Sequence, residues 1–328
     1  MHPDKTDLTQ GAVARRLWQV SAPMTLGLLS VLAVGIADAY FLARVSESAL
    51  AAVGFINPVI VAVTGLSIGM AAGANAALSQ ARGRNDDAQQ TAKLAFHASL
   101  FALAFGVSIA LVAWLGAPRL FGLLGAQGAV LDNTLAYIPY WALSFPILMG
   151  TMALEATFRA AGDGVTPSVM MVMSAVLNVA LTPLFIFGYG FVPEMGMAGA
   201  GLGTLVARAT TFGIVAVVTG KRRMVRAGSQ PFEGLAASAK SIISVALPAG
   251  LSKGINPAGM AVVTAAVATL GDTAVAGFGA AARIQAIALV PFFALSAGLG
   301  PVVGQAWGAQ DTPRARDAMR VAAGFCAL

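Results

Sequence analysis

The charged residues of this chain are spaced so widely that they leave long uncharged windows between them. Only 10% of the 328 residues are charged, against roughly 25% in soluble domains. Each window is long enough to cross about 30 Å of hydrocarbon as a helix. Two more windows would qualify but for one cation each, Arg208 and Lys253. We therefore expect eight membrane spans, within 17–37, 48–81, 94–118, 133–154, 164–193, 195–220, 241–271 and 284–310.

A helix is the expected form of every span, because lipid offers backbone amides no hydrogen-bond partner. The windows are also far longer than the roughly ten residues of a barrel strand. The predicted fold class is therefore an all-α membrane protein whose main environment is the lipid bilayer.

Lys and Arg are distributed unevenly between alternate loops. With a cytoplasmic N-terminus, the inside segments hold fifteen of these cations and the outside loops hold Arg44 and Arg119. This bias predicts a multi-pass protein of the cytoplasmic (inner) membrane with its N-terminus inside. It also accounts for the net charge of +6, so we expect no nucleic-acid partner.

Few residues could support cofactor chemistry. Cys326 is the lone cysteine, and His2 and His97 cannot form a metal site by themselves. The sequence has no G-x-x-x-x-G-K-[ST] loop to hold ATP phosphates. We expect no cofactor and no metal. Without an ATP site, transport across the membrane, if that is the function, would have to use an ion gradient, of either protons or Na⁺.

Two segments six spans apart resemble each other. Residues 70–86 and 295–311 align without a gap, and their identical pairs include Gln80 with Gln305 and Gly83 with Gly308. An even number of crossings returns the chain to the same side, which predicts parallel repeats. Two six-helix lobes would need twelve spans, of which about eight and the start of a ninth are expected here.

The repeat divides the chain into three expected parts. These are an N-terminal six-helix lobe over 1–220, a polar cytoplasmic linker over 221–240 and an incomplete C-terminal lobe over 241–328. We expect the natural protein to continue through the remaining helices.

Several motifs resemble those of the multidrug and toxic compound extrusion (MATE) family over nearly the whole chain. Gly304-Gln305-Ala306-Trp307-Gly308-Ala309 resembles its G-Q-x-x-G-A signature, and Arg159 to Pro167 resembles its R-x-x-G-D-x-x-x-P turn. The resemblance implies a monomeric transporter, not an enzyme. It implies export of amphipathic, often cationic, drugs in exchange for protons or sodium, by alternating access of two lobes.

Asp38 is the main candidate for ion coupling, because it lies deep in the first span. A carboxylate there costs about 2.5–3.5 kcal/mol on insertion scales, so it should face a cavity. The resemblance matches Asp38 to the essential first-helix aspartate of the family and places Asn178 and Thr204 around it. Thr182 stands where some members carry a second aspartate, which favours a protonation switch over a sodium cage.

Other polar and aromatic residues are candidates for the cavity or for substrate contact. Lys253 either reaches the cytoplasmic surface or lines the cavity, and Asn256 stands where sodium-dependent members often carry a glutamate. Tyr40, with Trp141 and Phe292, could bind cationic drugs through aromatic faces. Arg208 is expected to form a structural ion pair with Glu155, which also has Arg159 four residues later.

Two alternative functions remain open. A flippase of lipid-linked precursors in the same superfamily would need several cations in the cavity, and Arg208 with Lys253 is a small supply. An intramembrane enzyme would need clustered acids, a histidine pair or a nucleophile with its base. The sequence shows none of these groupings.

Overall fold

The computed structural model describes residues 7–190, 192–269 and 272–327, without the side chains of several residues between 254 and 283. Within this described part the chain is almost entirely helical. Its ten α-helices are α1 (Val13–Ala43), α2 (Glu47–Gly83), α3 (Ala88–Leu123), α4 (Gly128–Ala160), α5 (Val165–Phe187), α6 (Gly196–Lys221), α7 (Leu235–Ala268), α8 (Asp272–Ala288), α9 (Val290–Gly308) and α10 (Thr312–Cys326).

The eight predicted spans are confirmed, because eight described helices are long and apolar enough to cross a membrane. The eighth span differs from a single straight helix. It is divided between α8 and α9 at Leu289, and Pro291 lies in the first turn of α9. A proline has no amide hydrogen to donate and clashes with the preceding turn, which explains an interruption at this position.

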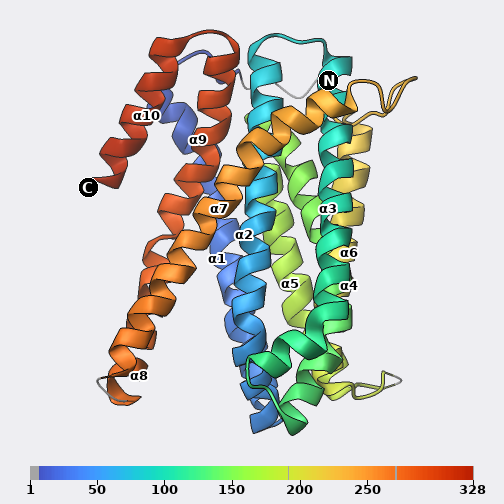
Figure 1. Ribbon diagram of the computed structural model, residues 1–328. Coiled ribbons are helices and arrows are strands. Elements are labelled where there is room, and N and C mark those ends of the chain that lie inside the picture. The colour runs from blue at the N-terminus through green and yellow to red at the C-terminus, as the bar shows by residue number, and fades with distance from the viewer. Residues whose placement is uncertain (1–6, 191, 270–271, 328) are drawn as a thin grey trace.

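The connections fall at two opposite ends of the bundle. Figure 1 shows the start of α1, the α2–α3 and α9–α10 turns and the segment between α6 and α7 at one end, called here the linker end. The α1–α2, α3–α4 and α5–α6 connections lie at the other end. The loops predicted to be cytoplasmic therefore share one end, and their side of the membrane stays a prediction.

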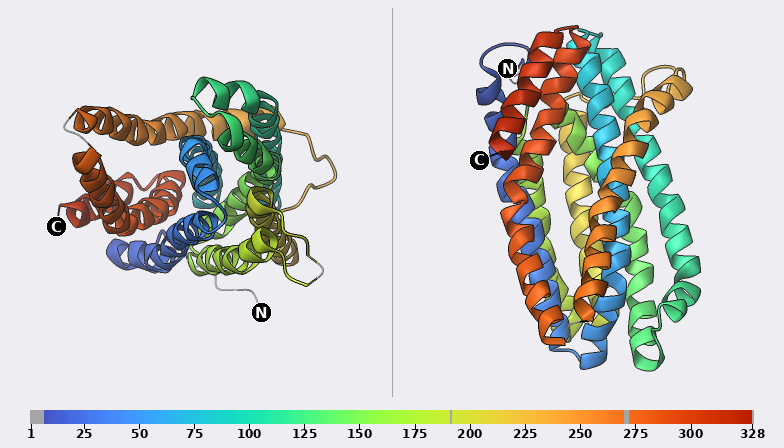
Figure 2. Two further views of the ribbon diagram at one scale, coloured as in Figure 1. Left: turned by 90° about the horizontal axis from the view of Figure 1, so that it is seen from below. Right: turned by 60° about the vertical axis from the view of Figure 1, so that its left-hand side comes forward.

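Helix α4 is the central helix of the first six. Of its spanning window, 67% is buried, more than in any other described span. Its neighbours include α2, α3 and α6, while α7 packs along α2, and α9 packs against α1 and α2. Figure 2 shows α1 to α6 grouped together, with α7 and the α8–α9–α10 segment beside them.

The two copies of the sequence repeat face each other at the linker end. A Cβ atom on Gly83 would collide with the carbonyl oxygen of Gln305, and one on Gly308 would collide with that of Gln80. The contact is reciprocal, as expected for parallel repeats related by a twofold axis along the membrane normal. We call these four residues the glycine seam, and it holds α2 and α9 in backbone contact.

The N-terminal segment is tied to the second half of the chain beside this seam. The guanidinium of Arg314 donates hydrogen bonds of 2.7–3.1 Å to the carbonyl oxygens of Leu8, Gln10 and Gly11. The Leu8 amide donates to Oε1 of Gln305 at 3.2 Å, and Leu8 itself is fully buried. Residues 8–11 therefore close over the junction between α1, α9 and α10.

The segment between α6 and α7 is held against α3. His97 Nε2 lies 2.7 Å from the carbonyl oxygen of Pro231, which can only accept, so this nitrogen carries the proton. His97 Nδ1 lies 2.8 Å from the hydroxyl of Ser238, and Lys93 pairs with Glu233 at 3.1 Å. A histidine that the sequence left without a role thus anchors the second half of the predicted linker, at Pro231 and Ser238.

Candidate functional site

A cavity of about 470 Å³ lies among α1, α2, α4, α5 and α6. Most of its wall is apolar, including Val31, Ile60 and Met171. The ionisable acids and bases that line it are Asp38, Glu155 and Arg208. The cavity therefore combines a hydrophobic surface with a few charged groups, as small-molecule sites commonly do.

Asp38 lines this cavity together with Asn178 and Thr204, while Thr182, the third polar residue predicted near it, is fully buried and does not line the cavity. Asn178 Nδ2 donates to Thr204 Oγ1 at 3.2 Å, and Thr182 Oγ1 donates to Asn178 Oδ1 at 3.4 Å. The Thr182 hydroxyl also lies near the Asp38 carboxyl group. Asp38 Oδ1 is buried and has no hydrogen-bond partner among the described residues. The carboxylate is thus placed to take up a proton or another ligand.

Helical spacing and a close helix contact assemble this polar group. Asn178 and Thr182 are four residues apart on α5 and therefore share a face. A Cβ atom on Gly203 of α6 would lie 2.9 Å from Thr182 Cα, so the two backbones nearly touch. This approach lets Thr204, the next residue on α6, reach Asn178.

The ion-pair partner predicted for Arg208 is wrong. It was expected to pair with Glu155, but Glu155 instead pairs with Arg159 at 3.5 Å. The Arg208 guanidinium donates to the Ser144 hydroxyl at 2.6 Å and interacts electrostatically with Asp38. Glu155 and Arg159 are four residues apart on one helix and meet without any tertiary contact.

A signal for the position of Arg208 was present in the sequence. Arg208 follows Thr204 by four residues on α6, so a helix that turns Thr204 toward Asp38 turns Arg208 toward the same cavity. Tyr137 was missed as well. It is buried, lines the cavity and lies one turn before Trp141 on α4.

Glu155 adds a second carboxyl group to a cavity in which the sequence had matched Asp38 alone to a coupling position. It is buried and lies near the linker end of α4. Its partner Arg159 also donates to the carbonyl oxygen of Met152 at 3.3 Å. The Glu155 carboxylate is therefore neutralised within its own helix, whereas Asp38 forms no ion pair within the described part of the chain.

The chain that forms this helical arrangement matches a known protein family. The sequence pattern of the MatE family matches residues 23–184 and 248–328. The chain belongs to this family. MATE proteins are transporters and not enzymes, which excludes the intramembrane enzyme that the sequence had left open.

Three individual proteins illustrate the relationship. A FAD transporter of Shewanella oneidensis is 31% identical over 98% of this chain and 71% of its own length. A probable multidrug resistance protein of Bacillus subtilis, YpnP, is 27% identical over 91% of this chain and 66% of its own. An outward-facing multidrug resistance MATE family transporter has 25% identity and a TM-score of 0.91, covering 99% of this chain and 72% of its own. The chain thus spans about two thirds of YpnP and somewhat more of the other two.

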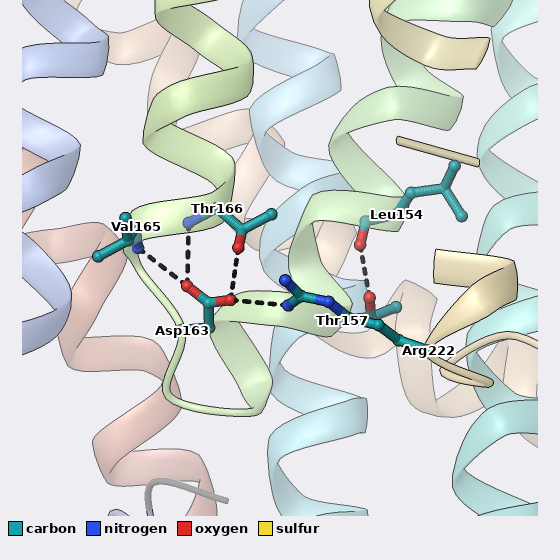
Figure 3. A network of polar contacts seen from close by, with 6 residues as sticks. All are labelled: Leu154, Thr157, Asp163, Val165, Thr166 and Arg222. Carbon is teal, nitrogen blue, oxygen red and sulfur yellow. Dashed lines mark hydrogen bonds and ion pairs between the residues drawn. The ribbon is translucent and has the colours of Figure 1, made fainter. Parts of the chain in front are cut away.

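The MATE turn after α4 has a structural explanation in this chain. Figure 3 shows Asp163 accepting hydrogen bonds from the amides of Val165 and Thr166 and from the Thr166 hydroxyl, at 2.6–3.1 Å. Arg222, just after α6, pairs with the same carboxylate at 3.2 Å. The aspartate therefore starts α5 and ties α5 to α6, and we assign it no role in transport.

Other predicted contact residues lie outside the Asp38 cavity. Tyr40 is 52% exposed, and Arg44 lies over its ring at 4.6 Å. The Lys253 ammonium lies 5.2 Å from the ring centroid of Phe293, and neither residue lines the cavity. Asn256 belongs to α7, but its side chain lies outside the described residues. Substrate contact by Tyr40, Lys253 and Asn256 stays a prediction.

Proposed function

We propose that this protein is a secondary active efflux transporter that exports amphipathic, cationic drugs by alternating access. The coupling ion would be the proton, with Na⁺ as the alternative, and the linker end would face the cytoplasm in the inner membrane. The transporting unit would be a monomer. The observation that carries the proposal is the half-buried Asp38 carboxyl group, whose Oδ1 has no hydrogen-bond partner among the described residues and which lines a largely apolar cavity beside Asn178, Thr182 and Thr204.

The chemistry of this site suits an exchange between a proton and a cation. Burial makes ionisation of a carboxyl group costly, and a nearby cation or hydrogen-bond donor offsets part of that cost. A cationic drug and a proton would then compete for the same ionised Asp38. Binding of either one would bias the equilibrium between the outward-open and inward-open arrangements by its differential affinity for the two.

Transport by the purified full-length protein in proteoliposomes tests the proposal. A pH gradient should drive movement of a cationic dye, and Asp38→Asn should abolish it, since asparagine keeps the volume but cannot exchange a proton. Glu47→Gln is the control, because Glu47 is an exposed acid at the first residue of α2, at the end of the bundle away from the linker end. Movement of the dye by Asp38→Asn at the wild-type rate would refute the assignment.

A second candidate is export of a flavin nucleotide. It is favoured by the relationship to a protein known as a FAD transporter and by the cation Arg208 in the cavity wall. Release of FAD from loaded proteoliposomes would distinguish it from drug efflux. The flippase alternative stays open, because FAD and a lipid-linked precursor would both bring a pyrophosphate to the single described cation on this cavity wall.

A further inference from the structure

Arg208 is a half-buried cation whose hydrogen-bonding capacity is largely unused. A guanidinium carries five N–H donors and no acceptor. Within the described part of the chain, Arg208 has one hydrogen bond, to the Ser144 hydroxyl at 2.6 Å, and no ion pair. Because Arg208 lines the cavity, its remaining donors are available to a molecule inside it.

The other charges of the cavity do not neutralise Arg208 by direct contact. Glu155 is engaged by Arg159 at 3.5 Å, and Asp38 interacts with Arg208 electrostatically without forming an ion pair. Protonation of Asp38 would leave Arg208 as the uncompensated charge of the cavity. An isolated buried charge is costly, so an anion would be favoured beside it.

The walls near these charges define the rest of the ligand. Trp141 and Tyr137 are the aromatic residues that line the cavity, and Leu28, Met170 and Met171 are among its apolar residues. A volume of about 470 Å³ lies within the range of roughly 300–1,000 Å³ usual for small-molecule sites. A compound with a flat aromatic part and an acidic group fits both the surface and the charge.

We propose that Arg208 is the anion-recognition residue of this cavity, and that its ligands are amphipathic aromatic compounds bearing a phosphate or carboxylate. This inference rests on the proposed function in one respect, since it takes the Asp38 cavity as the place where substrate binds. Flavin nucleotides are the ligand class that we select for the test.

In this proposal, the charge of the ligand decides whether protonation of Asp38 weakens or strengthens its binding. A cationic ligand competes with the proton, because both require the neighbourhood of the ionised carboxylate. An acidic ligand is repelled by that carboxylate and attracted by Arg208, so it binds together with the proton. An acidic substrate would therefore be bound while Asp38 is protonated, and its export would not be an exchange for that proton.

Equilibrium binding of FAD, FMN and riboflavin to the full-length protein in lipid nanodiscs tests the proposal by flavin fluorescence. The three probes share one ring system and carry two, one and no phosphate groups; FAD also carries an adenosine, so FMN and riboflavin are the pair that differs in phosphate alone. Wild-type protein should bind FAD and FMN at least about tenfold more tightly than riboflavin. Arg208→Gln should weaken FAD and FMN binding by about 10- to 100-fold, as expected for a hydrogen bond to a charged group, and change riboflavin binding less than about twofold.

Three further variants separate recognition from structural damage. Arg208→Lys should keep part of the preference for phosphate. Asp38→Asn should leave FMN affinity equal or increased, because the repelling carboxylate is gone. Thr210→Val is the matched control, since Thr210 lies on the same helix but is exposed, does not line the cavity and donates its hydroxyl hydrogen to the carbonyl oxygen of Val206. It should change all affinities less than about twofold.

Several results would overturn the inference. They are an equal loss of all three ligands in both Arg208 variants, weaker FMN binding in Asp38→Asn, no preference for FMN over riboflavin in the wild type, or no binding of any flavin. The proposed function fails by a different result. A protein that binds FMN through Arg208 yet moves neither flavin nor dye in proteoliposomes would refute transport and leave the anion site in place.

Discussion

Substitution of Gly83 by alanine tests whether the glycine seam closes the linker end. The new Cβ would collide with the backbone carbonyl oxygen of Gln305, which no side-chain rotation can move. Helices α2 and α9 must then separate locally. Overpacking of a close contact costs about 1–3 kcal/mol, which is roughly a 5- to 140-fold change in the ratio of closed to open linker ends.

Thiol labelling measures this ratio. Ser79 is fully buried on α2 against Gly304 of α9, so a cysteine there should react only when the seam opens. Cys326 is exposed and must first be replaced by serine. With an impermeant maleimide supplied to the linker end, the labelling rate of Ser79→Cys should rise by roughly 5- to 140-fold in the Gly83→Ala background.

The reciprocal glycine and an open glycine provide the controls. Gly308→Ala should produce a similar increase, because its Cβ would meet the carbonyl oxygen of Gln80. In the double variant, the free-energy cost to the closed linker end should be less than the sum of the two single costs, since one separation of α2 from α9 relieves both collisions. Gly213→Ala meets open space on α6 and should leave the rate unchanged. Equal labelling in Gly83→Ala and Gly213→Ala would refute the closed seam.

Three further predictions concern the linker end. His97→Ala should loosen the segment around Pro231 and speed its cleavage by added protease several-fold, because two partly buried hydrogen bonds are lost; unchanged cleavage would show that His97 is not its anchor. Arg314→Gln should lower the melting temperature and increase proteolysis before residue 12, since the carbonyl groups of residues 8–11 lose their donor; a wild-type melting curve and cleavage pattern would contradict this. Ser229→Cys in intact cells should resist an impermeant thiol reagent if the linker is cytoplasmic, and rapid labelling would reverse the topology.

The spans could be predicted because the bilayer imposes a requirement on each segment separately. A window without charges and long enough to cross hydrocarbon is helical whatever its neighbours are. The glycine seam could also be anticipated in part, since the Gln80 and Gln305 segments are similar and parallel repeats place equivalent surfaces together. Its carbonyl contacts could not, because they depend on the distance between two helices.

The residues of the site could be predicted only in part. Asn178, Thr182 and Thr204 were placed near Asp38 through the family resemblance, and the structure groups them there. The partner of Arg208 was predicted wrongly, because the rotation of α6 relative to α4 decides whether it meets Ser144 or Glu155. Spacing within α6 places Arg208 on the same face as Thr204, but it does not say which side chain of α4 Arg208 meets.

The bond network around Leu8 also has a consequence for biosynthesis. Arg314 lies 306 residues after the carbonyl group that it holds, so the first helix is complete long before its own fastening exists. At about 5–20 residues per second, this interval lasts roughly 15–60 s on the ribosome. During that time the nascent N-terminal segment is free to meet chaperones or peptidases, and only synthesis of α10 ends this exposure.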